Sequence, residues 1–237
     1  PEYRHRIADL TCGKGSFFNH ISNEEDIYGC EIDPDSFSIA RHLFPKANLM
    51  LGDIRNYNPG VHMNIVVGNP PYNLNWEYEG KKMQSQTVYI LKAAELLFPG
   101  GILAVIVPET FLGESTKKID VKRIYQLFNH VVQVSLDPNA FSWLGVRNFP
   151  TKLLILQRRA KALKRVPYNP EIVTLTECRD VYNTYMKPVM AITRKAAPQI
   201  TLEHNRSLQD EIEKKRKEEQ LLYQIRVHPR TRSQHDK

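Results

Sequence analysis

Residues 6–16 read RIADLTCGKGS, an apolar strand pattern that runs into a turn with two glycines and a helix start at about Ser16. A second unit of this kind follows it. Ile27–Ile32 predicts a strand, and Asp33 and Pro34 predict a helix start, because Asp can cap a helix and Pro fits its first turn. Strands and helices that alternate in this way are typical of an α/β fold with a parallel sheet.

The alternation continues over the first 160 residues. The expected strands are Arg6–Leu10, Ile27–Ile32, Asn48–Leu51, Asn64–Gly68, Ile102–Val107, Val131–Leu136 and Leu153–Gln157. Besides the helices that start at Ser16 and Pro34, we expect a polar loop over 69–82 and helices over Ser85–Phe98 and Val121–Phe128. The helix after Pro34 is expected to bury Phe37, Ala40, Leu43 and Phe44, and Pro99-Gly100-Gly101 to stop the long helix. The pattern therefore predicts a mostly parallel, seven-stranded sheet with helices on both faces.

The composition indicates a soluble globular chain, since 41% of the 237 residues are apolar and 25% are charged. We expect no transmembrane helix, because no run of 18 apolar residues exists, and no secretory leader, because no charged and then apolar stretch stands at the N-terminus. The chain starts at Pro1 without a preceding Met, so we expect a fragment or a processed piece. Cys12, Cys30 and Cys178 lack disulfide or zinc spacing and the histidines are scattered, which favours a reducing compartment and no metal site.

The positive charge is concentrated in the last third of the chain. Residues 1–157 carry 15 Lys and Arg against 16 Asp and Glu, a net charge of −1, whereas 158–237 carry 18 against 10, a net charge of +8. A basic extension indicates either a polyanionic partner such as nucleic acid or a solvated tail. We expect this extension, 159–237, to be partly helical and to be the start of a recognition region or a tail. Its expected elements are a strand in Val166–Glu177, a helix over Ser207–Gln224 and a disordered end at 226–237.

Ligands of parallel α/β sheets bind beyond the carboxyl ends of the strands. The first strand ends near Asp9, and Gly13 and Gly15 in the next loop allow a tight turn and close approach of a ligand to the backbone. The second strand ends in Glu31, which can accept hydrogen bonds from both hydroxyls of a ribose. The third strand is followed by Asp53, which can accept from the amino group of adenine. Three acids after three successive strands favour a ligand site.

The fourth strand ends in Gly68-Asn69-Pro70-Pro71-Tyr72, the most specific motif of the chain. Because two prolines fix the backbone, the side-chain oxygen of Asn69 and the carbonyl of Pro70 can both accept from one –NH2 group. Tyr72 offers a flat face on which a planar base can stack. The alternative interpretation is an ordinary Pro-Pro turn with a surface tyrosine.

With its motifs in this order, the chain resembles the S-adenosylmethionine-dependent N6-adenine DNA methyltransferases. The resemblance covers about residues 4–158 and has the gamma-type order, with the cofactor motif before NPPY; Asp9–Phe17 is similar to type I and type IIG modification enzymes. It implies a class I, Rossmann-like catalytic domain over 1–158 that methylates N6 of adenine in DNA, as a restriction-modification, phage or plasmid methylase. The implied location is the cytoplasm of a bacterial or phage-infected cell.

The resemblance also implies roles by position. The implied contacts of S-adenosylmethionine are Asp9, Thr11, Cys12, Gly13, Gly15, Glu31, Ile32, Asp53 and Ile54. The implied catalytic residues are Asn69, Pro70, Pro71 and Tyr72, and the implied partners of a flipped adenine are Tyr72 with Phe141 as first choice or Phe149 as second choice. The residues after 158 are too few for a large recognition domain, so we expect a catalytic core or dependence on another segment or subunit to read DNA.

Two other kinds of function stay open at this point. NPPY also occurs in methyltransferases that act on protein glutamine amides, and related motifs occur in enzymes that methylate adenine or guanine in RNA. A DNA cytosine-N4 enzyme usually has Ser or Asp in place of Asn69. A non-catalytic, methyltransferase-like module that binds nucleic acid through its basic extension is the remaining alternative, and cofactor binding separates it from the enzymes.

Overall fold

The computed structural model describes residues 5–166, 172–176 and 180–190. Eight strands form one sheet with the spatial order β10-β8-β9-β7-β4-β1-β2-β3. The strands are β1 (Ile7–Asp9), β2 (Ile27–Glu31), β3 (Asn48–Leu51), β4 (Met63–Gly68), β7 (Leu97–Pro108), β8 (Phe128–Ser135), β9 (Thr151–Arg158) and β10 (Thr174–Leu175). β9 runs antiparallel to β7 and β8, and the other pairs are parallel. The predicted α/β class and all seven predicted strands are confirmed. The further strand expected in Val166–Glu177 is also confirmed, because β10 lies within that range as a short eighth strand.

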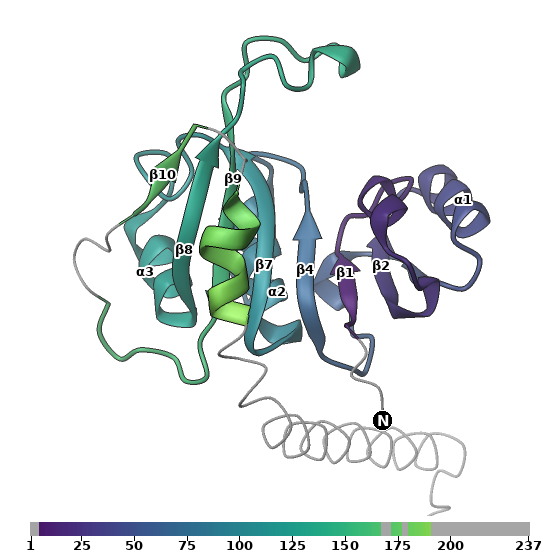
Figure 1. Cartoon of the computed structure of the whole chain (residues 1–237), viewed down its shortest axis with the longest axis horizontal. Coiled ribbons are helices and arrows are strands. Elements are labelled where there is room, and N and C mark those ends of the chain that lie inside the picture. The colour runs from purple at the N-terminus through teal and green to yellow at the C-terminus, as the bar shows by residue number, and fades with distance from the viewer. Residues whose placement is uncertain (1–4, 167–171, 177–179, 191–237) are drawn as a thin grey trace, which may run out of the picture.

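Helices cover both faces of the sheet, as predicted (Figure 1). On one face α2 (Ser85–Leu96) and α3 (Lys118–Leu127) pack against β4, β7 and β9 in the main core. α2 is buried on nearly every side, because it lies between the sheet, α3 and the hairpin described below. Within the described ranges, none of the helices has the length and hydropathy needed to cross a bilayer.

The opposite face has two smaller clusters. Next to β2 and β3, α1 (Pro34–Leu43) and the 3₁₀ helix η1 (Ser16–His20) bury Phe18 and Phe44, whose rings meet edge to face at 5.5 Å. Over β7, β8 and β9 lies a helical segment, 181–190, which includes the π-helical turn η5 (Tyr182–Met186). Part of the extension expected after residue 158 therefore packs on the sheet. The expected helix at Ser207–Gln224 and end at 226–237 lie outside the described residues.

Three predictions about secondary structure were wrong. The region predicted as a polar loop contains a β-hairpin, β5 (Asn75–Tyr78) and β6 (Lys81–Gln84), which turns through positive φ angles at Glu79 and Gly80. The segment after Ser16 forms only the single 3₁₀ helix η1, because Asn19, Ser22 and Asn23 are poor helix formers. Pro99-Gly100-Gly101 lies inside β7, so the long helix stops earlier, at Leu96.

The helix start at Pro34 was predicted correctly. The side chain of Asp33 accepts from Ser36 N at 2.9 Å and caps α1. Ala40 and Phe44, four residues apart, share the buried face, whereas Leu43 is rotated towards solvent and exposed, contrary to prediction. Two other 3₁₀ helices, η2 (Glu24–Asp26) and η3 (Ile54–Asn56), connect the strands of this half.

Candidate active site

The first part of the candidate site is the carboxyl end of β1. Asp9 is buried there, and its Oδ1 accepts from the backbone N–H of Thr11 at 3.0 Å. Tyr89 of α2 approaches the same oxygen, with its hydroxyl 3.3 Å away, and also contacts the carbonyl of Val67 in β4. Burial raises the pKa of the Asp9 carboxyl to about 7, although both hydrogen bonds favour its charged form.

Glu31 joins the glycine loop to the start of α1. Its Oε2 accepts from Gly13 N at 2.7 Å and its Oε1 accepts from Asp33 N at 2.8 Å. A carboxylate has about four acceptor positions, so two remain for the hydroxyls of a ribose. Gly13 and Gly15 both have positive φ, and a Cβ on Gly15 would lie 2.6 Å from the ring of Phe44. Close packing on the neighbouring core therefore requires glycine at position 15.

Cys12 and Cys30 line the inner side of this loop. Cys12 N donates to Cys30 O at 3.0 Å, and burial raises the pKa of both thiols. Neither thiol is ionised near neutral pH, so both act as small apolar groups. Among the described residues, His, Cys, Asp and Glu nowhere gather in a group of three that could hold a metal ion.

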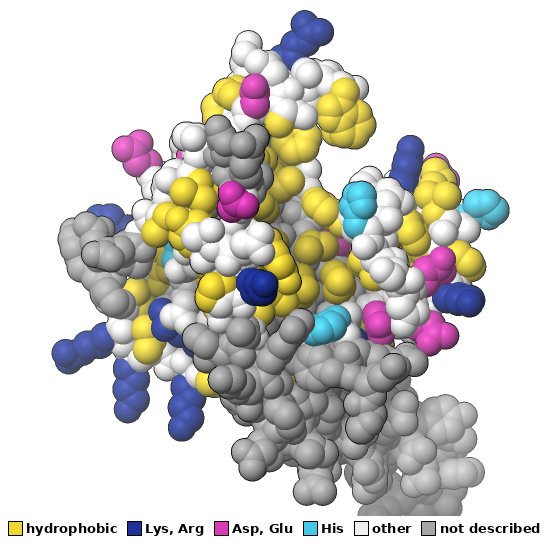
Figure 2. Space-filling view, viewed as in Figure 1, with side chains coloured by type: hydrophobic (Ala, Val, Ile, Leu, Met, Phe, Trp, Pro, Cys, Tyr) yellow, Lys and Arg dark blue, Asp and Glu magenta, His cyan; other side chains and the backbone are white. Residues whose placement is uncertain are grey.

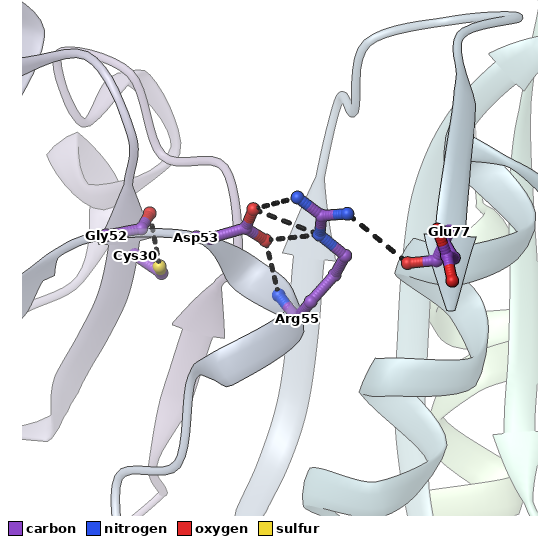
Figure 3. A network of polar contacts seen from close by, with 5 residues as sticks. All are labelled: Cys30, Gly52, Asp53, Arg55 and Glu77. Atoms are coloured by element: carbon purple, nitrogen blue, oxygen red, sulfur yellow. Dashed lines mark hydrogen bonds and ion pairs between the residues drawn. The ribbon is translucent and has the colours of Figure 1, made fainter. Parts of the chain in front are cut away.

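Asp53 lies at the end of β3 and is held by Arg55 (Figure 3). Arg55 Nε donates to Asp53 Oδ1 at 2.9 Å, and its Nη1 donates to the carbonyl of Glu77 in the β5–β6 hairpin at 3.3 Å. The hydrogen bond from Arg55 keeps the pKa of Asp53 below its usual value. Ile32, expected to lie on an adenine ring, is 67% exposed, whereas the side chain of Ile54 is in the core and can offer a ligand only its backbone.

The motif Asn69–Tyr72, predicted to be catalytic, follows β4 and is fixed by the start of α2. Ser85 Oγ donates to the carbonyl of Pro71 at 2.5 Å, and Asn73 N donates to Gln86 Oε1 at 2.9 Å. Asn69 is exposed and Pro70 is buried. The hydroxyl of Tyr72 donates to Asn69 Oδ1, so the amide oxygen is already used as an acceptor.

Two aromatic rings stack beside Asn69. Tyr72 and Phe149 have ring centroids 5.7 Å apart and planes inclined by 11°. Phe149 is held in place by its N–H, which donates to the carbonyl of Pro138 at 3.0 Å. The first choice from the sequence, Phe141, lies eight residues earlier in the β8–β9 loop, and among the described residues Tyr72 stacks on Phe149 instead. The path of a loop of this length is set by tertiary contacts that no sequence pattern shows.

Sequence reasoning missed Tyr89 and Arg55. Tyr89 was only one residue of an apolar helix, yet a tyrosine in such a helix needs a partner for its hydroxyl, and that requirement was the available signal. Arg55 stands two residues after Asp53, a spacing that permits a local ion pair. Both residues hold a predicted site residue and connect it to another element: Tyr89 connects Asp9 to β4, and Arg55 connects Asp53 to the β5–β6 hairpin.

A family model and several curated proteins, among them two methyltransferases, match parts of the chain. Residues 44–141 match the Eco57I restriction-modification methylase family. The chain is 32% identical over 112 residues to dTDP-3-amino-3,4,6-trideoxy-alpha-D-glucopyranose N,N-dimethyltransferase of Streptomyces venezuelae. This match covers 44% of this chain and 44% of that protein. The chain is also 28% identical over 109 residues to trans-aconitate 2-methyltransferase of Escherichia fergusonii, and this match covers 45% of this chain and 40% of that protein. The chain thus spans less than half the length of these curated relatives.

Solved structures show the same fold at low identity. A class I S-adenosylmethionine-dependent methyltransferase described from Listeria monocytogenes has a TM-score of 0.58 and 17% identity, covering 80% of this chain and 64% of that one. A type I restriction enzyme modification subunit described from Vibrio vulnificus has a TM-score of 0.53 and 17% identity, covering 76% and 47%. The M protein of the type I enzyme EcoKI has a TM-score of 0.52 and 18% identity, covering 65% and 40%. The class I methyltransferase fold and the predicted resemblance to restriction-modification methylases are confirmed.

Proposed function

We propose that this chain, which has the class I methyltransferase fold and a restriction-modification methylase segment, transfers the methyl group of S-adenosylmethionine to N6 of adenine in DNA. The observation that carries the proposal is the stacked pair of Tyr72 and Phe149 next to the amide of Asn69. An amide acceptor beside two aromatic faces fits a planar ring with an exocyclic –NH2 group.

The residues at the ends of β1, β2 and β3 fit S-adenosylmethionine. Asp9 would face the methionine part with its ammonium group, Glu31 has two acceptor positions left for the ribose hydroxyls, and Asp53 would accept from the adenine amino group. The exposed side chain of Ile32 offers an apolar surface to the adenine ring. When bound, this cofactor supplies an electrophilic methyl group on a sulfonium.

Asn69 and Pro70 activate the target amine. The lone pair of an adenine amine is delocalised into the ring, which makes the amine a poor nucleophile. Two acceptors on its N–H bonds, the Asn69 side-chain oxygen and the Pro70 carbonyl, favour a tetrahedral nitrogen and stabilise the positive charge that develops there. An amide is not a base at neutral pH, so the proton leaves to water after a direct transfer. Placement of the amine next to the methyl group accounts for most of the rate gain.

Tyr72 and Phe149 would clamp the target base. A base between two rings needs a centroid separation of roughly 7 Å, twice the roughly 3.4 Å spacing of stacked bases. The 5.7 Å separation is shorter, so the clamp must open when a base enters. If Tyr72 is the ring that moves, its hydroxyl leaves Asn69 and frees the amide oxygen for the amine. Because a base in a duplex cannot reach the clamp, the adenine must flip out.

The test is methyl transfer from isotopically labelled S-adenosylmethionine to unmethylated DNA, total RNA and a protein extract in parallel. We expect label in N6-methyladenine of DNA, and we expect Asn69→Ala to abolish transfer while S-adenosylhomocysteine still binds. Label in RNA or in glutamine would keep the cofactor site and replace the substrate. Cofactor binding without label in any substrate would favour dependence on a recognition partner, and no cofactor binding would favour the non-catalytic module.

A further inference from the structure

The loop between β8 and β9 carries a group of exposed apolar side chains that the proposed chemistry does not use. It projects beyond the carboxyl edge of the sheet (Figure 1), and Figure 2 shows hydrophobic side chains gathered on it. Trp143 is 77% exposed and Leu144 58% exposed, both in the 3₁₀ helix η4 (Ser142–Leu144), and Val146 is 41% exposed. Neighbouring apolar side chains that face solvent in this way mark an interaction surface.

The conformation of the loop is fixed by its own hydrogen bonds. Phe149 N donates to Pro138 O at 3.0 Å and closes the base of the loop, and Gly145 N donates to Ser142 O at 3.0 Å at the tip. Gly145 and Asn148 have φ angles of 82° and 54°, which turn the chain sharply back. These bonds hold Trp143 and Leu144 at the tip and Phe149 at the base, so the tip and the aromatic clamp belong to one structural unit.

We infer that Trp143 and Leu144 form a wedge that enters the DNA stack next to the flipped adenine; this inference rests on the proposed function. A flipped base leaves a gap in the duplex, and apolar side chains inserted at such steps stabilise the distorted DNA. A base stacked on an aromatic side chain gains binding energy whatever its sequence. Arg147, next to the tip, carries the charge that a phosphate at the edge of the gap would pair with.

DNA is favoured over a protein partner by continuity with the clamp. Phe149, which stacks on Tyr72, lies at the end of the loop, two residues before β9, and its own N–H makes the closing bond to Pro138 O. A nucleotide held between Tyr72 and Phe149 therefore brings its neighbours in the strand to the same loop. A protein seated on Trp143 would obstruct the access of a duplex to the clamp.

The direct test uses the fluorescence of Trp143. The chain has two tryptophans, so Trp76→Phe leaves Trp143 as the single reporter. Sonicated unmethylated duplex DNA is titrated with S-adenosylhomocysteine present, and DNA binding is measured separately by the anisotropy of labelled DNA. We expect Trp143 fluorescence to fall to about half or less as the complex forms, because stacked bases quench tryptophan. Binding of DNA with unchanged Trp143 fluorescence would overturn the wedge and leave the proposed function intact, whereas absence of DNA binding would overturn both.

A second test compares methyl transfer to duplex DNA and to the same DNA after heat denaturation. We expect Trp143→Ala and Leu144→Ala to reduce transfer to the duplex about tenfold or more, and Trp143→Phe to restore most of it, since base stacking on an aromatic ring is retained. Transfer to single strands relative to duplex should rise in both alanine variants, because single strands need no flipping. Leu43→Ala, an exposed leucine on α1, is the matched control and should change neither rate. Equal losses on both DNAs, or no loss on the duplex, would refute the wedge.

Discussion

Cofactor affinity should depend on pH through Asp9. Burial raises the pKa of its carboxyl from 3.8 to about 7, and only the ionised form attracts the ammonium group of the cofactor. The ionised fraction falls from roughly three quarters at pH 7.5 to roughly 3% at pH 5.5. The Kd of S-adenosylhomocysteine, which has the same amino-acid part, should therefore rise roughly 25-fold over this range. Isothermal titration calorimetry at half-unit steps of pH measures it directly.

The same ionisation affects the stability of the unliganded protein in the opposite direction: as the pH rises, cofactor affinity increases but the free energy of unfolding decreases. The folded carboxyl, with a pKa of about 7, holds its proton more tightly than the unfolded chain, where the value is 3.8. This group therefore lowers the free energy of unfolding as the pH rises from about 4 to about 7, by a total on the order of 4 kcal/mol. Because the affinity for S-adenosylhomocysteine is higher at pH 7.5 than at pH 5.5, the rise in Tm that this ligand causes should also be larger at pH 7.5.

Two variants isolate the effect. Asp9→Asn keeps the size of the side chain but removes the titrating proton, so its Kd should be weak and nearly constant with pH. Asp53→Asn is the matched control, because Arg55 keeps the pKa of Asp53 low and its charge does not change over this range. Asp53→Asn should raise the Kd by the same factor at every pH. A wild-type Kd that stays constant within about twofold, or an Asp9→Asn variant that keeps the slope, would refute the reasoning.

Three further outcomes are expected. Gly68→Ala should fail to fold or lose most of its stability by thermal denaturation, because its Cβ would lie 2.0 Å from the hydroxyl oxygen of buried Tyr89 and 2.6 Å from a ring carbon. Tyr89→Phe leaves the N–H of Leu10, now 3.2 Å from the hydroxyl, without this partner; it should cost about 1 to 3 kcal/mol and lower the Tm by several degrees. Glu31→Ala should weaken cofactor binding far more than it slows transfer at saturating cofactor, and Tyr72→Ala should slow transfer far more than it weakens cofactor binding. Steady-state kinetics with each ligand varied separates the two effects. Equal effects of both variants would contradict this division of the site.

The sequence predicted the sheet well because local patterns determine its strands. β3 has the predicted limits, and β2 and β4 differ from prediction by one residue each, since apolar runs between turn signals are sufficient to define them. The β5–β6 hairpin was missed although its signal is present: Trp76, Tyr78 and Met83 alternate with polar residues around Glu79-Gly80. Four strand residues on each side of a turn are too short a pattern to stand out from a polar loop.

Side-chain partners were harder to predict than strands because they depend on contacts between distant segments. Glu31 and Gly13 are 18 residues apart and belong to neighbouring strand ends, so their pairing follows from the βαβ unit. Phe149 and Tyr72 meet across two loops, and the choice between Phe141 and Phe149 depended on where the β8–β9 loop closes. Sequence spacing contains no information on that closure.

Tyr89 gives a physical reason why the two halves of the site are formed together. Its hydroxyl accepts from Leu10 N–H after β1, lies 3.3 Å from Asp9 and contacts the carbonyl of Val67 in β4, just before Gly68 and the proposed catalytic motif. The ring belongs to α2 and is fully buried, so it cannot move with β1 while leaving β4, or with β4 while leaving β1. A shift of β4 that moved Asn69 would therefore also change the hydrogen bonds of Asp9, so Tyr89 couples the proposed cofactor end of the site to the proposed amine end.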